Sequence, residues 1–115
     1  MKTRGLGLAI ALLLFGGMSY AANKTYTGEI MDSACAAMGS HEAMMKGNPN
    51  MTAKDCTLAC VAHGAKFVLY NPDTKTVYQL DDQKKPEQFA GAKVAVTGTL
   101  DDATKTIHVS KIKAS

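Results

Sequence analysis

The stretch KVAVTGTLDDATKTIHVSKI, Lys93–Ile112, carries the strongest structural pattern in this sequence. On both sides of the central DDATK (101–105), apolar side chains recur at alternating positions. This alternation is typical of a β-strand that buries one face and exposes the other, and DDATK is rich in turn-forming residues. The stretch therefore predicts a β-hairpin.

A second hairpin is predicted by the segments KFVLY (66–70) and TVYQL (76–80). They flank NPDTK (71–75), in which a Pro-Asp pair favours a tight turn. Nearer the N-terminus, TYTGEIMD (25–32) alternates in the same way and predicts a first strand. KKPEQFAG (84–91), between the two hairpins, predicts a helical turn.

The segment Ser33–Gly64 differs from the rest of the chain, because alanine, methionine and cysteine dominate it and β-branched residues are rare. It predicts helices rather than strands. SHEAMMKG (40–47) begins with a serine suited to an N-cap and ends with a glycine that can stop a helix. TAKD (52–55) resembles a capping box with aspartate in place of glutamate, and predicts the start of a helix that Gly64 ends.

The predicted order of elements is strand, helical insert, strand, strand, short helix, strand, strand. This is the order found in OB-type barrels. We therefore predict a mainly β protein, a small five-stranded OB-like barrel with a helical insert between strands 1 and 2. In such barrels the loop between these strands lines the binding face. Here that loop is the insert 33–64, which carries all three cysteines.

The N-terminal residues match a secretory signal peptide. Lys2 and Arg4 precede an apolar run, Leu6–Phe15, that is too short to cross a membrane, and small residues follow. Cleavage would give a signal peptide at 1–21 and one small domain at 22–115, without a membrane anchor. We expect an exported protein, periplasmic or secreted.

Charge and motifs exclude two broad function classes. The formal net charge of +3 falls to about +1 once the basic residues of the signal peptide are removed, and every remaining basic residue is lysine. Binding to nucleic acid therefore lacks its electrostatic driving force. The sequence contains no GxSxG, HExxH or phosphate-binding glycine loop, so we predict a protein that is not an enzyme.

The combination of GEIMDSAC (28–35), DCTLAC (55–60) and the two predicted hairpins resembles small exported bacterial proteins that carry an uncharacterised OB-fold-like domain, a domain of unknown function. The more specific part of the resemblance is a D-S-x-C motif followed by C-x-x-x-C. It implies an exported OB-like fold, and it implies no activity.

A candidate metal site follows from the spacing of cysteine and histidine. On a helix, Cys56, Cys60 and His63 lie on one stripe, because residues three and four apart are neighbours. Cys35 or His41 could fold over as a fourth ligand. Such ligands suit zinc, which takes four of them, and copper as Cu(I), which favours sulfur. The spacing matches no standard zinc motif.

The methionines that follow the signal peptide gather in the same region, at Met31, Met38, Met44, Met45 and Met51. Met38, Met44, Met45 and His41 are secondary candidate ligands, because thioethers bind soft metals and do not oxidise to disulfides. The alternative is that these methionines fill gaps between the insert and the barrel.

A disulfide is an equally serious interpretation, since exported cysteines normally oxidise. A bridge from Cys35 to Cys56 or Cys60 fits better than one within a single helix. It would close a loop of about 20–25 residues, stabilise the domain by on the order of 3 kcal/mol and leave one spare thiol. A thiol redox role is less favoured, because C-x-x-C is absent.

We therefore expect a non-enzymatic binding module of the cell envelope that holds copper or zinc through the insert. The alternative is a structural or interaction domain, stapled by a disulfide, that contacts a protein or glycan partner. The two differ in the state of the cysteines: the metal site needs them reduced, and the stapled domain needs one bridge.

Overall fold

The computed structural model describes residues 23–115, and the predicted signal peptide at 1–21 lies outside this range. Within it the chain forms five strands: β1 (Lys24–Asp32), β2 (Phe67–Asn71), β3 (Thr76–Leu80), β4 (Lys93–Asp101) and β5 (Thr106–Ala114). Between β1 and β2 lie the helices α2 (Ser33–Met38), α3 (Glu42–Met45) and α4 (Ala53–Ala62), and the 3-10 helix η1 (Lys85–Phe89) lies between β3 and β4. The mainly β fold and the helical segment between the first two strands are confirmed.

The strands form a single sheet that closes into a ring in the order β1-β2-β3-β5-β4. Both predicted hairpins are present as antiparallel pairs, β2 with β3 and β4 with β5. A short parallel pairing of β3 with β5, at Gln79 and Leu80, completes the ring. Alternate side chains of the strands point inward and make the main core, whose fully buried members include Ile30, Leu69, Val94, Val96 and Ile107.

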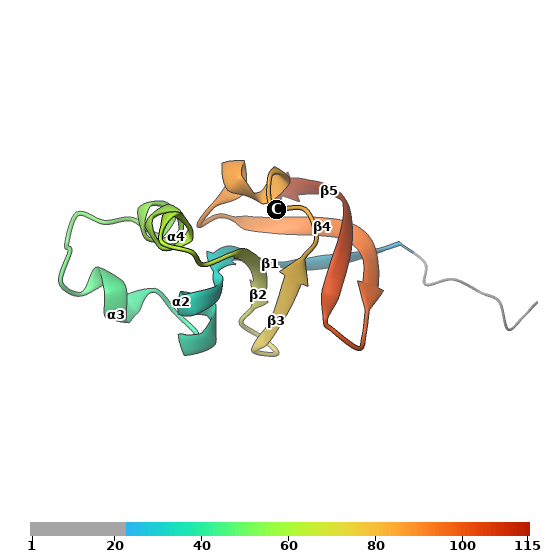
Figure 1. The fold of residues 1–115 in the computed structure, drawn as a ribbon, viewed down its shortest axis with the longest axis horizontal. Helices are drawn as coiled ribbons and strands as arrows, with labels where there is room; N and C mark the ends of the chain where they lie inside the picture. Colours follow the sequence, from blue (N-terminus) through green and yellow to red (C-terminus); the bar gives the residue numbers. More distant parts are fainter. Residues whose placement is uncertain (1–22) are drawn as a thin grey trace, which may run out of the picture.

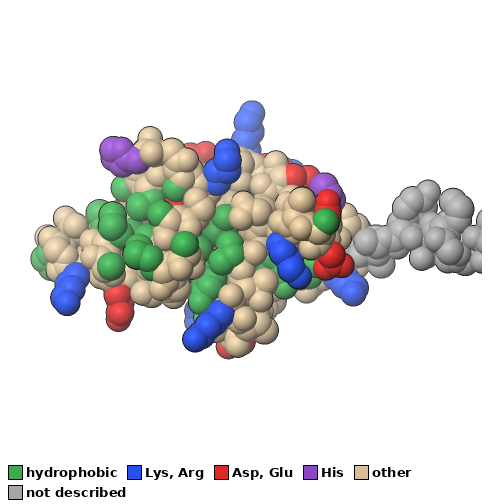
Figure 2. Space-filling model, turned by 60° about the horizontal axis from the view of Figure 1, so that its bottom comes forward, with side chains coloured by type: hydrophobic (Ala, Val, Ile, Leu, Met, Phe, Trp, Pro, Cys, Tyr) green, Lys and Arg blue, Asp and Glu red, His purple; other side chains and the backbone are tan. Residues whose placement is uncertain are grey.

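The three helices between β1 and β2 gather at one end of the ring, opposite the β4–β5 turn (Figure 1). A second cluster of buried side chains joins them to the ends of β1 and β2, and consists of Met31, Cys35, Ala36, Cys56, Val68 and Tyr70. Figure 2 shows apolar side chains over one face of the molecule, with charges of both signs scattered around them. Among residues 23–115, none of the helices has the length and apolar character needed to cross a membrane.

Local capping signals explain where α4 begins and ends. The Thr52 hydroxyl accepts a hydrogen bond from the Asp55 amide at 3.1 Å, and the Asp55 carboxylate accepts one from the Thr52 amide at 3.2 Å. This reciprocal pair is the predicted capping box. Gly64 follows the helix with φ +110°, a left-handed conformation that ends helices and suits glycine.

The helix predicted within 40–47 is shorter than expected. It covers only Glu42–Met45, with His41 rather than Ser40 at the N-cap position and Lys46 rather than Gly47 at the C-cap position. The Ser40 hydroxyl instead accepts a hydrogen bond from the Glu42 amide within a tight turn. That turn carries the His41 side chain inward, where it is only 8% exposed.

Candidate metal centre

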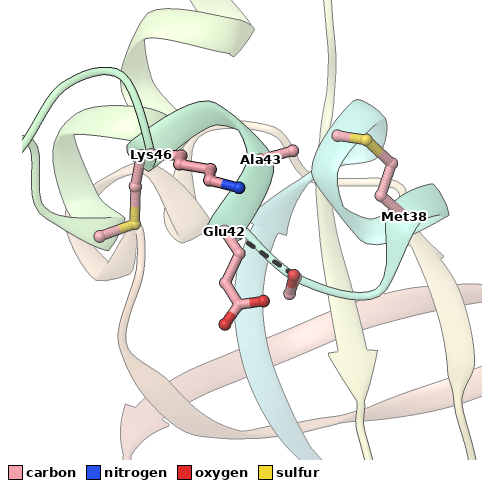
Figure 3. A pocket seen from close by; sticks show the side chains of 6 residues that line it. Met38, Glu42, Ala43 and Lys46 are labelled. Atoms are coloured by element: carbon pink, nitrogen blue, oxygen red, sulfur yellow. Dashed lines mark hydrogen bonds between the residues drawn. The ribbon is translucent and has the colours of Figure 1, made fainter.

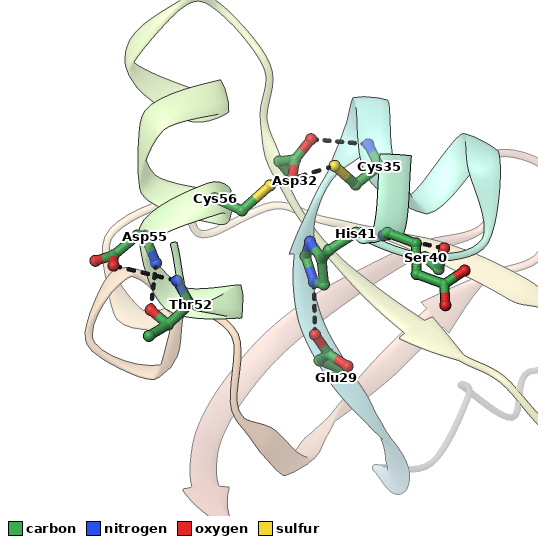
Figure 4. A network of polar contacts seen from close by, with 9 residues as sticks. Glu29, Asp32, Cys35, Ser40, His41, Thr52, Asp55 and Cys56 are labelled. Atoms are coloured by element: carbon green, nitrogen blue, oxygen red, sulfur yellow. Dashed lines mark hydrogen bonds and ion pairs between the residues drawn. The ribbon is translucent and has the colours of Figure 1, made fainter. Parts of the chain in front are cut away.

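Four buried side chains with metal-binding atoms meet beneath the helices: Asp32, Cys35, His41 and Cys56. Their ligand atoms all lie within 4.8 Å of one another (Figure 4). Each comes from a different part of the segment, namely the end of β1, the first turn of α2, the residue before α3 and the first turn of α4. The cluster therefore exists only when all three helices are docked.

The two thiols are spaced like two ligands of one ion. Cys35 Sγ and Cys56 Sγ are 3.7 Å apart and buried. Two sulfur atoms bound to one tetrahedral zinc ion at about 2.3 Å each lie about 3.8 Å from one another. A disulfide bond is much shorter, at about 2.0 Å. The structure therefore has no disulfide among the cysteines considered for one: Cys35, Cys56 and Cys60 are all free thiols.

The histidine is oriented towards the thiols by a carboxylate. His41 Nε2 lies 2.7 Å from Glu29 Oε2 on β1. This nitrogen is on the side of the imidazole that faces away from the sulfur atoms (Figure 4). With Nε2 donating its proton to Glu29, Nδ1 presents a lone pair. This Nδ1 is buried and has no hydrogen-bond partner among the described residues. A carboxylate on the outer nitrogen is the usual support of a metal-binding histidine.

Asp32 is held in a similar way. Its Oδ2 accepts a hydrogen bond from the Cys35 amide at 2.8 Å, which caps α2 and fixes the carboxylate. Its Oδ1 is buried and has no partner among the described residues. A buried polar atom without a partner costs about 1–3 kcal/mol. One cation between Asp32 Oδ1 and His41 Nδ1 would satisfy both atoms.

Burial keeps the Cys35 and Cys60 thiols protonated in the metal-free protein. It is the largest cause that raises the pKa of the Cys35 thiol well above its usual range, followed by the nearby Asp32 carboxylate and Cys56 thiol. Burial also raises the pKa of the Cys60 thiol, and the negative charge of Asp32 adds to this. A metal ion would have to displace the thiol protons, so binding is coupled to proton release.

The raised pKa of Cys35 predicts that the metal-free protein loses stability at alkaline pH. Above the ordinary thiol value of 9.0 the unfolded chain gives up this proton while the folded chain keeps it. The folded state then binds more protons, so the free energy of unfolding falls as pH rises, by at most about 1.4 kcal/mol per pH unit. Urea unfolding with chelator and reductant across this range measures the slope. In Cys35→Ala the slope should be smaller, and an equal slope would contradict the assignment.

The structure brings together three of the residues singled out in the sequence, Cys35, His41 and Cys56. Cys60 lies beside them, half-buried, but outside the four-residue group. His63 follows the end of α4 and is exposed, so the expected stripe does not converge on one point.

The methionines divide between surface and packing positions. Met38 and Met44 are exposed, at 55% and 43%. Met45 and Met51 pack against the second buried cluster, as the gap-filling interpretation predicts. None of the four is a member of the group of Asp32, Cys35, His41 and Cys56.

Asp32 is the functional candidate that the sequence analysis missed. The signal was present in D-S-A-C, since an aspartate three residues before Cys35 is an N-cap pattern. What the pattern could not show is that Asp32 lies near Cys56 and His41, because that placement depends on how the helices dock.

The fold and the cluster together define a mainly β protein with a five-stranded ring and a candidate metal centre in the helical segment between its first two strands. Residues 61–115, a little under half of the chain, are similar to the family described as protein of unknown function (DUF5818). The expectation of an uncharacterised domain is confirmed over that range. The match covers β2 to β5 and excludes all four cluster residues. Comparison with curated proteins and with solved structures gave no match.

Proposed function

We propose that this protein is an exported, non-enzymatic metal-binding domain that holds one zinc or copper ion at Asp32, Cys35, His41 and Cys56. The observation that carries the proposal is the state of His41. Its Nδ1 is buried without a partner, it faces the pair of thiols 3.7 Å apart, and its Nε2 is held by Glu29. The hydrogen bond to Glu29 fixes the imidazole ring, but no described residue pairs with Nδ1, and a bound ion would supply the missing partner.

The donor set favours a closed site. Two thiolates, an imidazole and a carboxylate match the ligands and the number that zinc takes in tetrahedral sites, and the thiolates also suit Cu(I). Catalytic zinc sites keep one position open for water, whereas four protein ligands leave none. The closed set therefore supports a binding role rather than catalysis.

The fold and the N-terminal pattern support the rest of the proposal. A ring ordered β1-β2-β3-β5-β4, with the helical segment at one end of it, agrees with a small OB-like barrel whose first loop has become a binding element. The signal-peptide pattern at 1–21 supports export to the periplasm or the exterior. We propose no nucleic-acid partner, because acidic and basic residues nearly balance after residue 21.

Metal titration of the reduced protein tests the proposed site. Native mass spectrometry with Zn²⁺ and with Cu(I) should show one ion per chain, and competition with a coloured chelator gives the affinity. Cys56→Ser should weaken binding by more than about 100-fold, and Glu29→Gln by about 10- to 100-fold, because that carboxylate orients His41. Met38→Leu, at an exposed position outside the cluster, is the matched control. Wild-type affinity in Cys56→Ser would sink the proposal.

The contact between Cys35 and Cys56 also favours a second candidate function. In an oxidising compartment these two sulfur atoms need little movement to form a bond. The protein would then be a stapled domain that contacts an envelope protein or a glycan. Intact mass of the exported protein, alkylated before and after reduction, separates the two. Three free thiols with a retained ion support the metal site, and a loss of two hydrogens without an ion supports the staple.

A further inference from the structure

A surface hollow beside the C-terminal end of α4 collects three side chains with soft donor atoms. They are the thioether of Met44, the thiol of Cys60 and the imidazole of His63, and the rest of the wall consists of serine and alanine residues. The methionine is 43% exposed, so its thioether is accessible from solvent. None of these three residues belongs to the buried cluster.

Cys60 borders both the hollow and the buried cluster. It lies one turn after Cys56 on α4, so the two side chains are neighbours on the helix surface. The Cys60 side chain also packs against the buried residues that include Cys35 and Cys56. Among the cysteines of residues 23–115, Cys35 and Cys56 are buried and Cys60 is the partly exposed one.

A closed site needs an accessible ligand at its edge. The four cluster side chains are at most 8% exposed, so an ion from solvent cannot reach them without first meeting another side chain. The hollow is lined by the exposed side chains of Met44 and His63 and by the half-buried Cys60, which also packs against the buried residues around Cys35 and Cys56. Thioether and thiol donors select Cu(I), whereas Zn²⁺ gains little from a thioether.

We propose that this hollow is an entry site for Cu(I), in which Met44 and His63 first bind the ion and Cys60 passes it to the buried cluster. This rests on the proposed function. The transfer is ligand exchange without a change of oxidation state. Cys60 releases its proton as its sulfur binds Cu(I). Cys35 and Cys56 then lose theirs as they replace it, one proton returns to Cys60, and two protons reach solvent in total.

A neighbouring hollow between α2 and α3 provides an internal comparison. It is lined by Met38, Glu42, Ala43 and Lys46 among others (Figure 3). It contains exposed thioether but no thiol or imidazole, and its one acidic and one basic side chain balance in charge. Met38→Leu therefore removes a methionine of similar exposure from a hollow that has no part in the proposed entry of Cu(I).

Stopped-flow transfer of Cu(I) from a coloured chelator to the reduced, metal-free protein tests the entry site. Loading should be slowed by at least about tenfold in Cys60→Ala and several-fold in Met44→Leu and His63→Gln, while one ion is still bound at equilibrium. Met38→Leu should load at the wild-type rate, and Zn²⁺ loading should be unchanged in Met44→Leu.

Different results would overturn the entry site and the proposed metal-binding function. Wild-type loading rates in Cys60→Ala and Met44→Leu, with one ion bound, would overturn the entry site and leave the proposed function intact. Loss of the ion at equilibrium in Cys60→Ala would make Cys60 a permanent ligand, which also overturns the entry role. A wild-type protein that binds no ion would overturn the proposed function itself.

Discussion

One equivalent of Zn²⁺ or Cu(I) should raise the midpoint of thermal unfolding of the reduced protein by about 10–20 °C. A ligand that binds only the folded state stabilises it by about 2.7 kcal/mol when free ligand is 100 times the dissociation constant. For a domain of this size, each kcal/mol shifts the midpoint by about 4–8 °C. The shift is measured by circular dichroism or calorimetry with and without a chelator.

The effect should be large because the metal would join elements that hold together weakly on their own. α2 has 6 residues, α3 has 4 and α4 has 10, and helices this short are unstable in isolation. The second cluster of buried side chains, which joins these helices to the ends of β1 and β2, is small and includes two of the proposed ligands, Cys35 and Cys56. An ion bound to these two thiols and to Asp32 would connect α2 and α4 directly to the end of β1.

Two variants check the origin of the shift. Cys56→Ser should unfold at the same temperature with and without the ion, since it lacks one thiolate of the cluster. Met38→Leu, on the exposed face of α2, should show the full wild-type shift. An equal shift in Cys56→Ser would place the bound ion elsewhere and contradict the cluster assignment.

Elements with a local cause were predictable from the sequence. The period-two pattern of Lys93–Ile112 specifies both the strands and their buried faces, because the side chains of Val94, Val96 and Ile107 are all fully buried. The capping box at Thr52 and Asp55 specifies the start of α4 through hydrogen bonds within four residues. In both cases the determinants lie within the segment that they shape.

The candidate site depends on contacts between distant segments, and there the sequence was less informative. Helical spacing places Cys56 and Cys60 on one stripe, yet α4 docks with Cys56 against Cys35 and leaves Cys60 half-buried. The inward position of His41 arises from the turn before α3 and from its partner Glu29, 12 residues earlier on β1. No local pattern encodes that pairing.

Replacement of Gly91 by alanine should destabilise the protein by about 2–5 kcal/mol and should weaken metal binding as well. Gly91 has φ +77°, a conformation that costs a non-glycine residue about 1–2 kcal/mol. A Cβ there would lie 2.5 Å from the Lys54 amide nitrogen and 2.7 Å from the Ala53 carbonyl carbon, both backbone atoms of α4. Such overpacking adds about 1–3 kcal/mol.

Relief of this clash has to move α4, because the loop that contains Gly91 is fixed on its other side. The Gly91 amide donates to the Ile30 carbonyl at 2.8 Å, and the Ile30 amide donates to the Ala92 carbonyl at 3.0 Å. These bonds tie the loop to β1 two residues before Asp32. A shift of the first turn of α4 carries Cys56 away from Cys35 and Asp32, which widens the cluster.

Gly47→Ala is the matched control, since Gly47 lies between α3 and α4, has no positive φ and would place its Cβ in open space. It should change the free energy of unfolding by no more than about 0.5 kcal/mol. Urea unfolding of the metal-free variants and chelator competition give the two readouts. If Gly91→Ala lost stability but kept wild-type affinity, α4 would not position Cys56 for the ion. Loss of both would show that the strand ring, through one glycine loop, sets the geometry of the metal centre.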